Sequence, residues 1–207
     1  KTTIVYAGLN SSTSSSTYWG KKVKGLDEEE TPSDVQIVGE KDFSSVWWTT
    51  FSDDYVIPAN KTLKLKFVNH SSKAENWNNW SIVLTSDADR GDTNYQEYFV
   101  LRADNFAWFN GDFNNNSGSN TSVKFSLDSN YNWFTFPDDM DGSTVVMTVS
   151  REGSTINVDA DITTSTSSTF YETLSVKDCG DGTQPVRAFL VCDGSWYEMF
   201  TSACYVE

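Results

Sequence analysis

Two tryptophans stand among asparagines at residues 76–80 (NWNNW), directly before the apolar run at residues 82–84. Exposure of indole rings to water is unfavourable, and so is burial of amides in a core, so the combination suits a solvent-exposed surface that binds a ligand. A sugar ring fits such a surface, because its C–H faces stack on aromatic planes and its hydroxyls pair with amides. The alternative is a loop whose tryptophans cap a hydrophobic core.

A second group lies on an expected strand at residues 97–104. Regular alternation puts apolar side chains on one face, and the opposite face then carries Tyr98, Val100, Arg102 and Asp104. Arg102 and Asp104 could bind adjacent hydroxyls while Tyr98 stacks on a ring. The competing interpretation is a surface ion pair beside a tyrosine. Trp108 follows in a segment that alternates aromatic and polar residues, as a binding rim would.

Alternation also divides the asparagine–tryptophan segment. Trp80 should point inward with Ile82 and Leu84, and Trp77 should stay outside in the preceding loop. The adjacent Trp47 and Trp48 should likewise point to opposite faces. The candidate carbohydrate-binding residues are Trp77, Asn79, Arg90, Tyr98, Arg102, Asp104, Trp108 and Trp133.

Three carboxylates occur close together in the acidic segment at residues 86–92. Calcium takes several oxygen ligands from flexible loops, so Asp87, Asp89 and Asp92 are candidate ligands of a structural calcium ion. The spacing differs from that of an EF-hand, and Arg90 could neutralise the loop without a metal. A solvated hairpin loop is the competing interpretation.

The sequence contains few residue arrangements that are typical of an enzyme active site. His70 is the single histidine, and nothing near it resembles the turn that carries a serine nucleophile. Paired carboxylates on one strand, typical of jelly-roll glycoside hydrolases, are missing, although acids on separate strands could converge: Glu97, Asp104, Glu172 and Glu198. We therefore expect a protein that is not an enzyme.

The amino-acid composition argues against several classes of binding partner. The 207 residues carry a formal net charge of −14, which argues against nucleic acid and disfavours acidic polysaccharides. No apolar run is long enough to span a membrane. Three cysteines lie near the C-terminal end, so one disulfide with one free thiol, or three free thiols, are the options: Cys179, Cys192 and Cys204. The single histidine makes a zinc site improbable.

Short alternating strands dominate the remaining chain. In residues 62–67 (TLKLKF) every second residue is apolar, and similar segments occur at 80–84, 97–103, 122–127, 144–150, 155–162, 170–176, 186–191 and 196–200. Helical periodicity is scarce. The pattern predicts an all-β fold, an antiparallel, jelly-roll-like β-sandwich. We expect one domain over residues 1–207, with a Ser/Thr-rich loop or linker around residues 11–17.

Several segments together resemble a family. Residues 51–58 (FSDDYVIP), 63–69, 76–80 and 95–104, with EYFVLRADN, are similar to β-sandwich modules attached to secreted polysaccharide-degrading enzymes of gut and rumen Bacteroidetes. The resemblance implies non-catalytic carbohydrate binding through an aromatic and polar site, often with a structural calcium ion. It also implies a secreted or cell-surface location and attachment to a catalytic domain.

Combined with the acidic charge, this resemblance leads to a neutral plant polysaccharide, a β-glucan or a hemicellulose, as the expected ligand. Two alternatives stay open at this point. One is a jelly-roll glycoside hydrolase or polysaccharide lyase, and it needs two carboxylates that face one cleft. The other is a surface adhesion domain, and it needs a flat hydrophobic patch without a groove.

Overall fold

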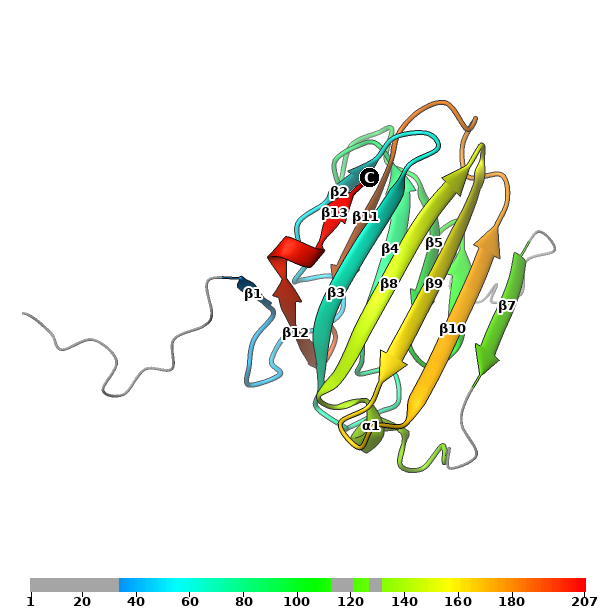
Figure 1. Cartoon of the computed structure of the whole chain (residues 1–207). Coiled ribbons are helices and arrows are strands. Elements are labelled where there is room, and N and C mark those ends of the chain that lie inside the picture. Colours follow the sequence, from blue (N-terminus) through cyan, green and yellow to red (C-terminus); the bar gives the residue numbers. More distant parts are fainter. Residues whose placement is uncertain (1–33, 113–120, 127–131) are drawn as a thin grey trace, which may run out of the picture. The chain divides into compact units, whose positions relative to one another are not determined.

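The computed structural model describes residues 34–112, 121–126 and 132–207, which form two antiparallel β-sheets packed face to face (Figure 1). The expected Ser/Thr-rich segment at 11–17 lies outside the described residues. Within them, the larger sheet follows the order β1 (Val35–Val38), β12 (Ser195–Phe200), β3 (Thr62–Ser71), β8 (Ser143–Glu152), β9 (Thr155–Thr163), β10 (Thr169–Val176), β7 (Thr121–Ser126), with β13 (Tyr205–Val206) also paired to β3. The smaller sheet follows the order β2 (Tyr55–Ile57), β11 (Val186–Val191), β4 (Ser81–Ser86), β5 (Glu97–Arg102), β6 (Phe106–Phe109).

The antiparallel sandwich predicted from the alternating segments is confirmed. Strand β3 shows the reason, because Leu63, Leu65 and Phe67 are buried while the side chains between them are partly or fully exposed. The inner faces of both sheets meet in one core. Each fully buried aliphatic or aromatic side chain there contributes about 1.5–3 kcal/mol. Helical structure in the described residues is limited to α1 (Phe136–Met140) and a 3-10 turn, Thr201–Ala203.

The smaller sheet also carries apolar side chains on its outer face. Val83, Val100, Trp108, Phe189 and Val191 form a second hydrophobic cluster, and Trp47, Phe51 and Phe106 pack against it. Strand β4 is therefore buried on both faces. The segment before β2 folds over this outer cluster, and the candidate site forms beside it.

A β-bulge lies between β4 and β5. Leu84 pairs with Phe99 while Thr85 pairs with Glu97, so Tyr98 is the extra residue. The expectation that Tyr98 shares a face with Arg102 and Asp104 is wrong, because the bulge reverses the alternation and turns Tyr98 into the main core. The same reversal brings Glu97 onto the outer face.

Strand alternation was also used to predict the orientation of two pairs of tryptophans. Trp80 is fully buried and Trp77 is 43% exposed, as alternation predicted. Trp47 and Trp48, however, lie in a turn rather than on a strand, and both pack on the outer cluster. Trp47 is half-buried against that cluster and Trp48 is 36% exposed, so the two differ as expected, but the turn and not strand alternation is the reason.

All three cysteines are free thiols, since Cys179, Cys192 and Cys204 form no disulfide. Across the part of the chain that is described, no helix is long and apolar enough to cross a membrane.

Candidate functional site

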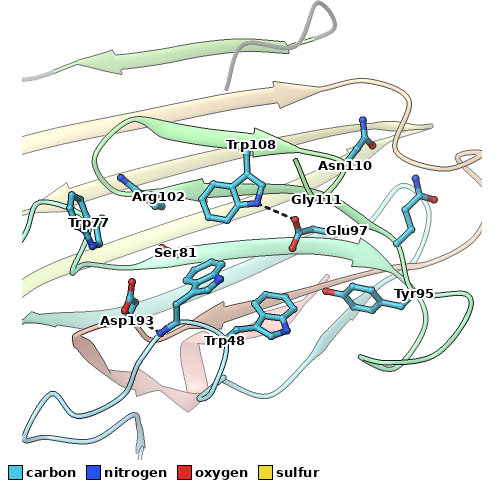
Figure 2. A pocket seen from close by; sticks show the side chains of 12 residues that line it. Trp48, Trp77, Ser81, Tyr95, Glu97, Arg102, Trp108, Asn110, Gly111 and Asp193 are labelled. Carbon is cyan, nitrogen blue, oxygen red and sulfur yellow. Dashed lines mark hydrogen bonds between the residues drawn. The ribbon is translucent and has the colours of Figure 1, made fainter. Parts of the chain in front are cut away.

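A cleft of about 770 Å³ opens on the outer face of the smaller sheet (Figure 2). Strands β5 and β6 form one side, and the segment before β2 forms the other. Its lining combines aromatic rings with polar side chains: Trp47, Trp48, Trp77, Ser81, Tyr95, Gln96, Glu97, Arg102, Trp108, Asn110, Gly111 and Asp193. This volume falls within the range of about 300–1,000 Å³ that is typical of small-molecule sites.

Three tryptophans are packed at the middle of the cleft. Trp108 on β6 donates its indole N–H to Glu97 Oε1 at 3.1 Å, which fixes its ring. The ring of Trp47 meets that of Trp108 edge-on, with centroids 5.3 Å apart. Trp48 packs on Trp47 at 5.7 Å and on Phe189 at 6.1 Å. The rings are therefore held before any ligand arrives.

Trp48 adopts a backbone conformation that is unusual for a bulky residue. Its φ angle is 68°, in the left-handed region, yet its side chain remains 36% exposed. Such strain costs on the order of 1–3 kcal/mol and tends to occur at functional sites. The position is therefore a candidate for a functional role.

Trp77 and Arg102 form the opposite end of the cleft. The Arg102 guanidinium lies 4.5 Å from the centre of the Phe106 ring and 5.7 Å from that of Trp77. Its Nε donates to Asp104 Oδ1 at 3.0 Å, and its Nη2 donates to Asp104 Oδ2. The ion pair that competed with the sugar-reading interpretation is therefore present. It also holds Arg102 in place between two aromatic rings.

Two carboxyl groups face the same cleft. Burial raises the pKa of Glu97, and the hydrogen bond from Trp108 opposes that rise. Burial likewise raises the pKa of Asp193, while the backbone N–H of Trp47 and the charge of Arg102 lower it. Both groups can accept hydrogen bonds from hydroxyls, and when protonated each can donate one.

Tyr95 closes the far side of the cleft, and Figure 2 shows its hydroxyl directed toward the tryptophans. Burial raises the pKa of Tyr95 to about 12, so the hydroxyl is neutral at physiological pH. Its oxygen is buried and has no hydrogen-bond partner among the described residues. A buried polar atom without a partner is costly.

A second cleft of about 610 Å³ adjoins the first, because Trp77 and Arg102 line both. Trp133 and Phe134 lie on its other side and are 46% and 92% exposed. Trp133 stacks on the buried ring of Phe136 at 5.7 Å, with an angle of 9° between the planes. Trp77, Arg102 and Trp133, together with Asp104, are therefore brought together around this second cleft.

Three other predicted binding residues lie elsewhere. Asn79 is 1% exposed. Its Oδ1 accepts a hydrogen bond from Asn69 Nδ2, and its Nδ2 donates to the Asn76 carbonyl, so the side chain stabilises the fold. Tyr98 lines a separate small pocket beside Cys179. Arg90 stacks 4.4 Å from Phe51 and pairs with Asp54 at 2.8 Å, outside the cleft.

The predicted calcium loop is engaged by an arginine from β11. Arg187 Nε lies 2.7 Å from Asp87 Oδ1, and its Nη1 lies 2.8 Å from Asp89 Oδ1. Asp92 instead accepts a hydrogen bond from the Asn94 backbone N–H. Over the residues with described positions, no three His, Cys, Asp or Glu side chains are grouped so as to hold a metal ion.

His70 lines neither cleft. It lies on β3 in the larger sheet, where its ring stacks on Trp196 at 3.8 Å and its Nε2 is 3.0 Å from Glu198 Oε2. Glu198 is thereby engaged on that sheet. Glu172 is in the core, so neither acid joins Glu97 at the cleft.

Nine lining residues of the first cleft were not among the predicted binding residues, and the most informative of them are Trp47, Trp48, Tyr95, Glu97 and Asp193. The tryptophan pair was a visible signal, since two adjacent indoles in a polar segment rarely both fit a core. Glu97 was hidden by the bulge. Asp193 lies in the turn between β11 and β12, which meets the Trp47 backbone only through the fold.

Comparisons with known proteins add little to this geometry. No family model and no curated protein matches the chain. One solved structure found in the search is the lectin UEA-II complexed with galactose, at 7% sequence identity and a TM-score of 0.29. That match covers 83% of this chain and 84% of the lectin. The fold and the site are therefore defined by the strand pairing and the clefts described above.

Proposed function

We propose that this domain binds a neutral polysaccharide, without catalysis, in the aromatic cleft on the outer face of the smaller sheet. The observation that carries the proposal is the convergence of the exposed rings of Trp48 and Trp77 with the polar groups of Glu97, Arg102 and Asp193 on one cleft. Rings stack on sugar faces, and the fixed polar groups bind hydroxyls. A plant β-glucan or hemicellulose suits the net charge of −14.

In its biological setting the domain would act outside the cell or at the cell surface, and it would bring an attached enzyme to its substrate. Each stacked ring contributes about 0.5–1.5 kcal/mol. Association entropy offsets much of this gain, so we expect dissociation constants of about 1 μM or weaker.

The test is isothermal titration with soluble mixed-linkage β-glucan, xylan and glucomannan. We expect at least one to bind, and W48G and W77A should each weaken that binding about three- to tenfold. Glycine is chosen at Trp48 because it accepts a φ of 68° without strain, so the substitution removes the ring and not the turn. Y171A is the matched control, since Tyr171 is 47% exposed on β10 of the other sheet. Failure to bind every glycan in the panel would refute the proposal.

One observation favours a second candidate, a glycoside hydrolase. Glu97 and Asp193 face one cleft, which is the feature that hydrolysis of a glycosidic bond requires, and burial raises the pKa of both. Reducing-sugar release from the polysaccharide that binds best tests it. Release that E97Q abolishes would assign an enzyme; no release from wild type, despite binding, supports the non-catalytic proposal.

A further inference from the structure

The two clefts adjoin at Trp77 and Arg102. Trp77 and Arg102 belong to the walls of both, and Arg102 is held there by Asp104 and by the Phe106 ring. Trp77 keeps 43% of its surface exposed at this junction. A ligand that leaves the first cleft past Trp77 therefore enters the second without losing aromatic contact.

The second cleft is lined by two exposed aromatic rings. Phe134 is 92% exposed, the highest value among the large hydrophobic side chains described. The neighbouring Trp133 is 46% exposed although its other face stacks on Phe136. The Phe134 N–H donates to Asn132 Oδ1 at 2.9 Å. Clustered apolar exposure of this kind marks an interaction surface.

The volumes of the two clefts indicate how long a ligand must be to fill both. The first cleft, at about 770 Å³, is already large enough for a small ligand such as a disaccharide. Such a ligand would leave Trp133 and Phe134 in water and the 610 Å³ cleft unused. A chain that continues across Trp77 covers both sets of rings.

We propose that the ligand is an extended glycan chain that occupies both clefts at once and passes over Trp77 at their junction. This inference rests on the proposed function, since it names the form of the ligand that the same face binds. Trp48 serves the first cleft and Trp133 with Phe134 serves the second. Binding is therefore to a stretch of chain several sugars long, and neither cleft requires a chain end.

The experiment titrates wild type with a disaccharide, a tetrasaccharide and a hexasaccharide prepared from the polysaccharide of the panel that binds best. We expect affinity to rise at least about tenfold from disaccharide to hexasaccharide, because each added ring contact contributes. W133A and F134A should each weaken hexasaccharide binding about three- to tenfold and leave disaccharide binding unchanged. W48G should weaken both.

Two features keep the outcome decisive. F134A removes a side chain that is 92% exposed, so its fold is secure even if W133A disturbs the stack on Phe136, and Y171A controls for loss of an exposed ring elsewhere. Equal affinity for disaccharide and hexasaccharide, or full hexasaccharide affinity in F134A, would overturn the extended-chain inference and leave sugar binding intact. Absence of binding to every polysaccharide of the panel would overturn both.

Discussion

At the scale of single residues, Glu172 is the most unusual side chain of the core. It points inward from β10 and is fully buried, and within the described part of the chain neither carboxylate oxygen has a hydrogen-bond partner. Burial raises its pKa well above 4.5, the charge of Asp104 raises it further, and the charge of Arg102 lowers it. Since the charges of Arg102 and Asp104 act on Glu172 and both residues line the second cleft, Glu172 lies close behind that cleft.

The raised pKa predicts how Glu172 affects stability. Below about pH 4 the carboxyl is protonated both folded and unfolded, so it contributes nothing to the pH dependence. Above 4.5 the unfolded chain releases its proton while the folded chain holds it, so stability falls as pH rises toward the folded pKa. E172Q removes this loss and should be more stable than wild type at pH 8 by about 1 kcal/mol or more, but not at pH 4.

Urea denaturation of both proteins across this pH range measures the effect. E152Q is the control, because Glu152 on β8 is exposed and its substitution should change stability little at any pH. An E172Q curve parallel to that of wild type would show that Glu172 is not a buried neutral acid.

At the scale of elements, the loop after β4 is fastened by Arg187 on β11. That guanidinium contacts Asp87 at 2.7 Å, Asp89 at 2.8 Å and Asp54 at 3.3 Å, so one side chain joins the loop to the segment before β2. These hydrogen bonds raise the pKa of Arg187, which stays charged. The arginine thus supplies the positive charge that calcium was predicted to bring.

One pair of measurements decides between the arginine and calcium. R187K keeps the charge but loses the planar fork of donors, so it should lower the free energy of unfolding by about 1 kcal/mol. Wild type should have the same Tm in calcium and in chelator, because Asp87 and Asp89 are already neutralised. A Tm that rises with calcium in wild type would instead establish the ion.

At the scale of the whole molecule, the formal charge of −14 constrains the ligand. Binding of a neutral glycan involves no net charge pairing, so its dissociation constant should change less than about twofold between about 0.05 M and 1 M NaCl. An acidic polysaccharide such as polygalacturonate should bind weakly at low salt, since the protein repels it. Titrations at the two salt concentrations check this. Tight, salt-sensitive binding of the acidic polymer would contradict a neutral ligand.

Much of the sandwich could be read from the sequence because its signals are local. A strand with one buried face favours an apolar residue at every second position; β9 keeps that period throughout, and β3 and β8 keep it over residues 63–67 and 145–149. The inward Trp80 and outward Trp77 followed from the same rule. The division of Trp47 and Trp48 did not, because the rule holds only on a strand and these residues are in a turn.

The two clefts could not be predicted in the same way, because the residues that line them meet only after folding. The extra residue Tyr98 reverses the alternation of β5, and a single-residue bulge leaves no mark in the apolar pattern. Asp193 reaches the Trp47 backbone across 146 positions of sequence. By itself the sequence determined an acidic, aromatic-rich antiparallel sandwich. The tertiary structure decided which rings share a cleft, because long-range packing, and not local periodicity, places them.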